Sequence, residues 1–473
     1  MPRRAIVWFR RDLRLADNPA LADALARAQG VAPLFVEPDT TAPHGPGAAS
    51  LAWMECSLRA LDTDLRARGS ALTRRAAGAP QALAQAASEC GATLVTCSRD
   101  GTPAGIAEEH AVAATLARAG VELRVSETQL LAPPGSLTTS AGSPYAVFTP
   151  FSRAWRAALR PSEPLPAPGR VPSIALTGQR SPARANAAAH DTTYAWTPGE
   201  VGAHRRLGEF VRDGLDAYEA ERDIPGTRGT SELSAHLAWG ELSPRQVVAA
   251  VSARADDAVA WPFLRQLAWR EFAYHVLSAH PETLDSPLRG EFAAFPWRDD
   301  PAGLEAWVEG RTGYPLVDAG MRQLAETGWM HNRVRLVAAS FLVKDLLIPW
   351  KTGDEAFRAR LVDYDAAANV FNWQWVAGSG ADAAPYFRIF NPSLQGTRFD
   401  ADGTYVRRWV PELARLSPRW IQRPWLAPDA DLRAGGITLG RSYPHPMVDH
   451  AETRQRALAA LECMKELRTA ISE

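Results

Sequence analysis

Small hydroxyl side chains cluster at the start of a predicted helix, in Gly226-Thr-Arg-Gly229-Thr230-Ser231-Glu232-Leu233-Ser234. The two glycines permit a close backbone turn, and the first N–H groups of a helix lack intrahelical acceptors. Free N–H groups and hydroxyl donors together suit a pyrophosphate. Taken alone, such a stretch is more often a helix cap that binds no ligand.

Aromatic and charged residues recur at helical spacing in Phe263-Leu-Arg-Gln266-Leu-Ala-Trp269-Arg270-Glu271-Phe272. A stacking ring with polar donors beside it suits a flat ligand. A buried ion pair next to a hydrophobic core would leave the same pattern, and the sequence slightly favours this plainer interpretation.

Two later stretches combine arginine, asparagine, aspartate and tryptophan: Gly328-Trp-Met-His-Asn332-Arg333-Val-Arg335-Leu336 and Asp363-Tyr364-Asp365-Ala-Ala-Ala-Asn369-Val-Phe-Asn-Trp373. Isolated Arg–Asp pairs are usually ordinary salt bridges. Here they occur beside amides and rings, and a helical core rarely retains so many polar groups without use. Tryptophan is also biased, because 13 of the 16 lie after residue 195. Core packing does not easily explain that bias.

The elements that must position these residues differ along the chain. Before residue 130, short apolar runs alternate with helical patterns, which predicts a parallel α/β sheet. The expected strands are Ala5–Arg10, Val31–Glu37, Ala71–Arg75, Thr93–Ser98 and Val121–Val125. Pro19, Pro80 and Pro103 fall where proline suits the first turn of a helix. No Gly-x-Gly-x-x-Gly motif follows the first strand, so a dinucleotide fingerprint is absent.

The rest of the chain predicts a linker and then helices. Seven prolines lie between residues 160 and 198, a composition typical of a connecting segment. The expected helices are Leu207–Glu221, Ser231–Trp239, Pro244–Arg254, Trp261–Ala279, Val317–Thr327, Arg333–Leu347 and Asp354–Leu361. We therefore expect an α/β domain over residues 1–130, an interdomain linker over 131–199 and an all-helical domain over 200–473.

Composition narrows the class of protein. The 473 residues are 46% hydrophobic and 22% charged, with a net charge of −1, so contact with nucleic acid requires a local basic patch. The four cysteines show no metal-ligand spacing, and we expect a reduced cytoplasmic protein without a bound metal. No signal peptide is visible. The apolar run 336–350 is interrupted by Lys344 and Asp345, too early for a membrane span.

Four further motifs establish a resemblance: Val7-Trp-Phe-Arg-Arg-Asp-Leu-Arg-Leu-Ala-Asp17-Asn-Pro-Ala-Leu, Phe148-Thr-Pro-Phe151, Gly313-Tyr-Pro-Leu-Val-Asp318-Ala-Gly-Met-Arg322 and Asp382-Ala-Ala-Pro-Tyr-Phe-Arg388-Ile-Phe-Asn-Pro392. With the stretches above, the chain resembles the DNA photolyase and cryptochrome family over nearly its whole length. The similarity is closest to the class I cyclobutane pyrimidine dimer photolyases.

The resemblance implies an antenna-type α/β domain and a helical domain that binds FAD. The implied FAD contacts are Tyr218, Thr230, Ser231, Glu232, Leu233, Ser234, Phe263, Arg270, Asn332, Arg335, Asp363, Tyr364, Asp365 and Asn369. Within this set, Asp363 and Asp365 would flank the flavin and ribose, and Arg335 would pair with Asp363. Asn369 matches the residue that faces flavin N5. A neutral amide there tolerates an anionic reduced flavin better than a carboxylate would.

The resemblance also implies an electron-transfer chain of Trp373, Trp350 and Trp297, through which light reduces the flavin. Asn369 and Gln266 complete the implied catalytic set. The partner would be ultraviolet-damaged DNA, whose dimer is flipped out of the duplex. The implied DNA contacts are Arg222, Gln266, Trp269, Arg270, Asn332, Arg333 and Gln395. We expect a monomer.

Three positions depart from the cyclobutane dimer photolyases. Gln266 replaces a glutamate that bonds the dimer, Leu336 replaces methionine, and Phe263 replaces a tryptophan found in several relatives. A lost or weakened substrate bond costs about 1–3 kcal/mol, so impaired repair is an alternative. The (6-4) photolyases carry glutamine at the position of Gln266, but their paired histidines are absent, because the local sequence is His331-Asn332.

Two hypotheses follow from these matches and departures. The first is a light-driven repair enzyme, which the lack of a long tail after the final helix favours. The second is a photolyase-like or cryptochrome-like blue-light flavoprotein with weak or lost repair, which the three substitutions favour. A DNA-binding module without photochemistry would leave the FAD motif and the tryptophans unexplained. Gly101-Thr-Pro-Ala-Gly105 lacks the Asn-Glu pair of folate-binding relatives, so a folate antenna is not supported and the antenna chromophore is unknown.

Overall fold

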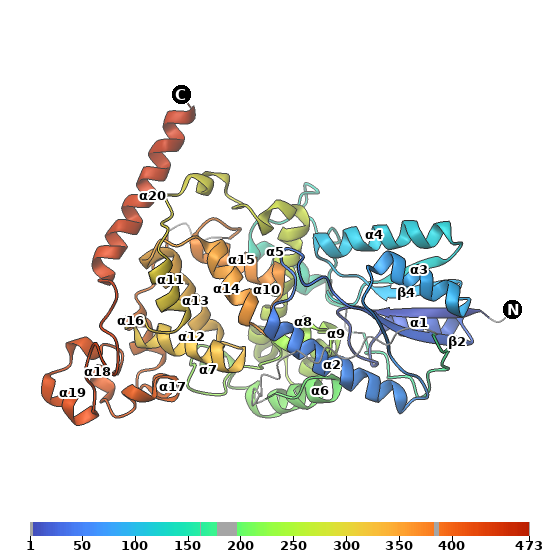
Figure 1. Ribbon diagram of the computed structural model, residues 1–473, viewed down its shortest axis with the longest axis horizontal. Helices are drawn as coiled ribbons and strands as arrows, with labels where there is room; N and C mark the ends of the chain where they lie inside the picture. Colours follow the sequence, from blue (N-terminus) through green and yellow to red (C-terminus); the bar gives the residue numbers. More distant parts are fainter. Residues whose placement is uncertain (1–2, 161, 177–195, 383–386, 473) are drawn as a thin grey trace. The chain divides into compact units, whose positions relative to one another are not determined.

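The computed structural model describes residues 3–160, 162–176, 196–382 and 387–472. The chain divides into two compact units, each built from three segments. The first unit comprises Met1–Asp216, Ser231–Pro281 and Val362–Ala367, and the second comprises Ala217–Thr230, Glu282–Leu361 and Ala368–Glu473. Figure 1 traces the elements of each unit along the sequence.

A five-stranded parallel sheet forms the N-terminal part of the first unit, with the strand order β3-β2-β1-β4-β5. The strands are β1 (Arg4–Phe9), β2 (Gly30–Val36), β3 (Thr73–Arg75), β4 (Leu94–Ser98) and β5 (Glu122–Ser126). Each lies within about two residues of a strand expected from the sequence, so the predicted parallel α/β sheet is confirmed.

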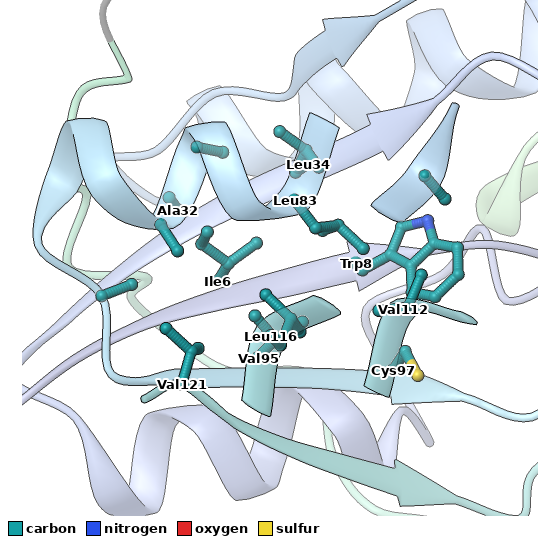
Figure 2. Close-up of a cluster of buried hydrophobic side chains, with 14 of the residues drawn as sticks. Ile6, Trp8, Ala32, Leu34, Leu83, Val95, Cys97, Val112, Leu116 and Val121 are labelled. Atoms are coloured by element: carbon teal, nitrogen blue, oxygen red, sulfur yellow. The ribbon is translucent and has the colours of Figure 1, made fainter. Parts of the chain in front are cut away.

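Helices cover this sheet because its central strands are apolar on both faces. On one face, α3 (Ala79–Cys90) and α4 (Pro103–Arg118) enclose a core with Ile6 and Trp8 of β1, which Figure 2 shows. Helices α1 (Pro19–Arg27) and α2 (Ala48–Arg66) complete the α/β part, and α1 packs on β1, β4 and β5. Prolines do stand in the first turn of α1, α3 and α4, as predicted.

The remaining helices of the first unit lie in its three chain segments. They are α5 (Phe148–Ala158), α6 (Glu200–Glu209), the π-helical segment η1 (Phe210–Gly214), α8 (Ser234–Ala238), α9 (Pro244–Arg254) and α10 (Asp257–Ala279). Helix α10 packs against α5 and α9. Because α5 falls within 131–199, part of the predicted linker is helical, whereas residues 177–195 lie outside the described residues.

The second unit is helical throughout its described residues, apart from turns and the bridge between Leu439 and Tyr443. Its longer helices are α11 (Pro301–Val308), α12 (Pro315–Thr327), α13 (Asn332–Ser340), α14 (Trp350–Arg360), α15 (Ala366–Ala377, which begins in the first unit), α16 (Pro392–Phe399) and α20 (His450–Ser472). Short helices are α7 (Tyr218–Glu221), α17 (Thr404–Trp409), α18 (Pro418–Ile421) and α19 (Asp429–Gly435), with 3-10 turns η2 (Pro281–Leu284), η3 (Gly290–Ala294), η5 (Pro411–Leu413) and η6 (Pro424–Leu426). The predicted α/β-plus-helical fold is confirmed.

Two predicted helix starts are four residues late, because α10 begins at Asp257 and α14 begins at Trp350. Three other predicted helices are wrong for local reasons. The expected helix 231–239 begins only at Ser234, because Glu232 adopts a left-handed backbone with φ of 53°. The expected helix 207–221 is broken by the π-helical turn η1, and the helix expected from Arg333 to Leu347 changes to the π-helical segment η4 (Phe341–Asp345). Hydrophobic periodicity does not reveal such interruptions of the backbone.

Candidate functional site

The residues predicted to act together lie in both units. The first unit holds Ser231, Glu232, Leu233, Ser234, Phe263, Gln266, Trp269, Arg270, Asp363, Tyr364 and Asp365. The second unit holds Tyr218, Arg222, Thr230, Trp297, Asn332, Arg333, Arg335, Trp350, Asn369, Trp373 and Gln395. The predicted pairing of Arg335 with Asp363 joins the two sets and stays a prediction.

The hydroxyl-rich turn is held in shape by polar contacts. Arg206 donates from Nε to the carbonyl oxygen of Ser231 at 2.9 Å and pairs with the Glu232 carboxylate at 2.9 Å. Trp196 Nε1 also donates to Glu232, at 3.1 Å. These bonds fix the left-handed residue ahead of α8, which Ser234 begins. Glu232 therefore bonds to Arg206 and Trp196 and helps to set the conformation of the turn.

Helix α10 presents three half-buried polar or aromatic side chains on one side, at the spacing of i, i+3 and i+4. Gln266 donates from Nε2 to the carbonyl oxygen of Pro262 at 3.1 Å, so the oxygen Oε1 remains as an acceptor. The Trp269 ring stacks on Phe148, with 3.4 Å between centroids and 7° between planes. Arg270 donates to the carbonyl oxygen of Gln129 at 2.8 Å.

The side of α10 that faces the core carries Glu271, which was not among the predicted site residues. Its carboxylate accepts from the N–H groups of Leu131 and Ala132 and from Trp155 Nε1, at 2.7 to 2.8 Å. Burial raises the pKa of Glu271 to about 6, against the lowering effect of these three donors. Glu271 thus anchors the start of the predicted linker, and α5, to the helix that carries Arg270.

Asp365 is the terminus of a buried hydrogen-bonded series that the sequence did not reveal. Tyr274 Oη donates to Asp365 Oδ2 at 2.8 Å, and Gln129 Nε2 donates to Tyr274 Oη at 2.8 Å. Gly101 N donates to Gln129 Oε1 at 3.0 Å. The guanidinium of Arg270 lies 3.9 Å from Asp365 Oδ2. The only sequence signal for Tyr274 was its position one helical turn after Arg270.

Asn369 in the second unit is oriented by a buried carboxylate. Its Nδ2 donates to Asp354 Oδ1 at 2.5 Å. With the amide nitrogen committed to Asp354, the amide oxygen is the group left to face a ligand. The position of Asn369 opposite flavin N5 stays a prediction.

The three tryptophans of the predicted electron-transfer chain all lie within the second unit, and Trp373 and Trp297 have aromatic neighbours. Trp373 contacts Phe357 and Trp307, with centroid distances of 5.0 and 6.3 Å. Trp350 is buried at the start of α14, whereas Trp297 is half-buried beside Phe295. Exposure therefore increases from Trp373 to Trp297, in the order expected for a chain that ends at the surface.

The predicted DNA contacts of the second unit include partly paired arginines. Arg333 pairs with Asp223 at 2.9 Å and lies 4.5 Å from the centroid of Phe399. Arg222 lies 5.6 Å from the Tyr218 ring. Gln395 is in α16, which packs against α13, the helix that Asn332 begins. Arg333 is therefore already paired with a carboxylate, and Arg222 lies against an aromatic ring.

Among the described residues, no group of three His, Cys, Asp or Glu side chains is arranged to hold a metal ion. None of the helices in the described ranges is both long and apolar enough to cross a membrane.

Two family models match this chain. The "FAD binding domain of DNA photolyase" matches residues 263–463, and "DNA photolyase" matches residues 5–169. A deoxyribodipyrimidine photo-lyase of Agrobacterium fabrum is 44% identical over 471 residues, covering 98% of both chains. The chain belongs to the DNA photolyase and cryptochrome family.

Other relatives fall in both branches of the photolyase and cryptochrome family. The solved structure of a bacterial class III photolyase from Agrobacterium tumefaciens has a TM-score of 0.94 and 43% identity, and 98% of each chain is covered. Arabidopsis thaliana cryptochrome-1 is 36% identical, over 98% of this chain and 71% of its own. The predictions of a photolyase-type enzyme and of FAD as cofactor are confirmed.

The donor set of this photolyase-family chain fits FAD. Hydroxyls of Thr230, Ser231 and Ser234 have the chemistry to bind the phosphates and the ribityl chain. The Asp365 carboxylate could accept from ribose hydroxyls, and the oxygen of Asn369 could accept from a ring N–H. The individual contacts with FAD stay predictions.

Proposed function

We propose that this protein repairs ultraviolet-damaged DNA by splitting cyclobutane pyrimidine dimers with light. The observation that carries the proposal is the similarity, over 98% of both chains, to a curated deoxyribodipyrimidine photo-lyase. When bound, reduced FAD would supply the excited electron that opens the cyclobutane ring and receive it again afterwards.

In this proposal the residues of the chain would bind and orient FAD. Asn369, whose amide nitrogen is bonded to Asp354, would present its amide oxygen to flavin N5 and so favour the reduced flavin. Arg270 and the hydroxyl-rich turn would lie in the same FAD pocket, the turn at the phosphates. Trp373, Trp350 and Trp297 would be the residues that supply electrons to an oxidised flavin.

The dimer would be flipped out of the duplex and recognised by stacking and by polar edges. Trp269 offers a ring that Phe148 already holds in place. Gln266 offers Oε1, because its amide nitrogen is bonded to Pro262. A glutamine so oriented supplies one of the two acceptor oxygens that a glutamate would supply, which supports retained repair. Arg222, Asn332, Arg333 and Gln395 would contact the DNA backbone and the neighbouring bases.

The subclass within the family is part of this proposal. The sequence motifs resemble class I enzymes, whereas the solved structure with 43% identity and a TM-score of 0.94 is described as class III. Similarity over 98% of each chain weighs more than single motifs. We therefore propose a class III photolyase that acts on the same lesion.

We propose that folate is not the antenna chromophore. Gly101 N is bonded to Gln129, and a Cβ on Gly105 would lie 2.6 Å from the Cβ and Cγ of Asp100. A longer side chain at position 105 would therefore displace Asp100. Ala104 and Gly105 themselves carry no side chain that could make the contacts of the Asn-Glu pair in folate-binding relatives.

A weakly repairing, cryptochrome-like flavoprotein is the second candidate, favoured by Gln266, Leu336 and Phe263 together. Photoreduced protein should be illuminated with an oligonucleotide that contains one thymine dimer, and restored thymines counted. The repair proposal expects dimer splitting that depends on light and on reduced flavin. A protein that binds FAD and the oligonucleotide but restores no thymine under these conditions supports the second candidate.

A further inference from the structure

Tyr274 is a fully buried phenol that is hydrogen-bonded to Asp365, one of the predicted FAD contacts. It lies on α10 of the first unit, with 0% of its surface exposed. Its Oη donates to Asp365 Oδ2 and accepts from Gln129 Nε2, both at 2.8 Å. Both neighbours of the phenol oxygen are therefore fixed, one as a proton acceptor and the other as a donor.

We propose that Tyr274 is a second light-driven electron donor to FAD, separate from the tryptophan chain, with Asp365 as its proton acceptor. The proposal rests on the proposed function and on the predicted position of Asp365, which the family resemblance puts next to the flavin and its ribose. Tyr274 loses one electron to light-excited, oxidised FAD and, in the same step, its phenolic proton to Asp365 Oδ2. The products are a neutral tyrosyl radical, a protonated Asp365 and FAD reduced by one electron.

The charges around Tyr274 explain why loss of the electron and of the proton must be coupled. The Arg270 guanidinium lies 5.3 Å from the ring centroid, and Arg11 and Asp100 also act on the phenol electrostatically. Burial, with Asp365 second, raises the pKa of Tyr274 well above its usual value, so the phenol is protonated at rest. An oxidised ring that kept its proton would be a cation beside Arg270 in a medium of low dielectric constant. Transfer of the proton over 2.8 Å to a carboxylate removes that cost.

The same contacts also favour the return of the electron and the proton to Tyr274 after its oxidation. Gln129 is fixed by Gly101 N at its Oε1, so its amide N–H stays directed at the phenol oxygen during oxidation. Arg270, 3.9 Å from Asp365, holds the carboxylate next to Tyr274. The proton therefore remains within hydrogen-bond distance, and an external thiol that returns an electron restores the phenol. A residue needed only for packing would not require this hydroxyl, since phenylalanine fills the same space.

The test uses FAD-loaded protein in which Trp373→Phe has interrupted the tryptophan chain. Illumination should generate a neutral tyrosyl radical, identified by electron paramagnetic resonance and by the change in its hyperfine pattern when ring-deuterated tyrosine is incorporated. We expect Tyr274→Phe to abolish that signal and the residual photoreduction of the flavin. We also expect D2O to slow the residual photoreduction, because a proton moves with the electron.

Tyr443→Phe is the matched control, because Tyr443 is equally buried and donates to Asp318 Oδ2 at 2.6 Å, at a position with no predicted flavin contact. This variant should keep the tyrosyl signal. A signal that persists in Tyr274→Phe, or that is absent before that change, overturns the inference. Flavin content and dimer repair of the chemically reduced wild-type protein are measured separately, so failure of the proposed function is distinguishable from failure of the inference.

Discussion

The two units prepare their parts of the site by different physical means. In the first unit, the side chains of Gln266, Arg270 and Asp365 are positioned by directed hydrogen bonds, such as Tyr274 to Asp365. In the second unit, the tryptophans are positioned mainly by close packing of rings, as around Trp373. Directed bonds to ionisable groups depend on pH, whereas ring packing depends on volume. The part of the site in the first unit should therefore respond mainly to pH, and the part in the second unit mainly to changes in side-chain volume.

Loss of the Trp373 indole should produce the largest change in photoreduction of the flavin, because this indole belongs to the predicted electron-transfer chain of the second unit. Trp373→Phe keeps an aromatic ring but removes the easily ionised indole, so we expect most of the blue-light reduction of FAD by external thiol to be lost. The flavin absorbance under continuous illumination measures this rate. Trp420→Phe is the control, since Trp420 bonds the surface carboxylate of Asp431 and belongs to no predicted chain. Equal rates in both variants would refute the predicted chain.

Overpacking next to the same ring should come second in size. Gly353 lies in α14, and an added Cβ would be 2.2 Å from Trp373 Cη2. We expect Gly353→Ala to lower the free energy of unfolding by about 1–3 kcal/mol, although alanine favours helices. In α6 of the first unit, a Cβ on Gly208 meets nothing within 4 Å. Gly208→Ala should therefore leave stability unchanged or slightly raised, and urea titration of both variants checks the contrast.

Titration of Glu271 tests the hydrogen bonds of the first unit. The folded-state pKa of about 6 exceeds the usual 4.5, so the folded protein binds more protons than the unfolded chain between these values. The free energy of unfolding should accordingly fall as pH rises from about 4.5 to 6, by about 2 kcal/mol from this group.

Glu271→Gln should remove that part of the pH dependence and lower stability at every pH, since one amide oxygen replaces two carboxylate acceptors. Urea unfolding at several pH values between 4 and 7 gives the slope for each protein. Glu326→Gln, on the exposed side of α12, should leave the slope as in the wild type. An unchanged slope in Glu271→Gln would show that other groups cause it.

Gln266→Glu should have the smallest effect and bears directly on repair. A charged acceptor strengthens a substrate bond by roughly 1.5 kcal/mol, but the bond from Gln266 Nε2 to Pro262 is lost. We expect dimer repair to rise by at most about tenfold, measured as thymines restored per photon absorbed. If the wild type repairs weakly and the variant repairs no better, Leu336 and Phe263 would be responsible for the weak repair. A wild type that already repairs at full yield would show that glutamine suffices at this position.

The sequence by itself determined the elements whose signals are local. Alternating apolar runs located the five strands, and the prolines of α1, α3 and α4 marked helix starts, because these signals act within a few residues. Ordered motifs such as Trp269-Arg270 and Asp363-Tyr364-Asp365 also identified the family and its cofactor. Such motifs consist of residue types at fixed spacing, so they can be recognised without knowledge of the surrounding packing.

Only the tertiary structure decided which polar groups are partners. Tyr274 meets Gln129 across 145 positions of the chain and Asp365 across 91, and Glu271 meets Leu131 across 140. Local patterns in the sequence do not predict such long-range pairs. A buried polar group bonds to a partner that the fold brings near it, however distant that partner is in the chain. The left-handed turn at Glu232 and the π-helical segment after Ser340 were likewise hidden, since they arise from backbone contacts with no pattern of hydrophobicity.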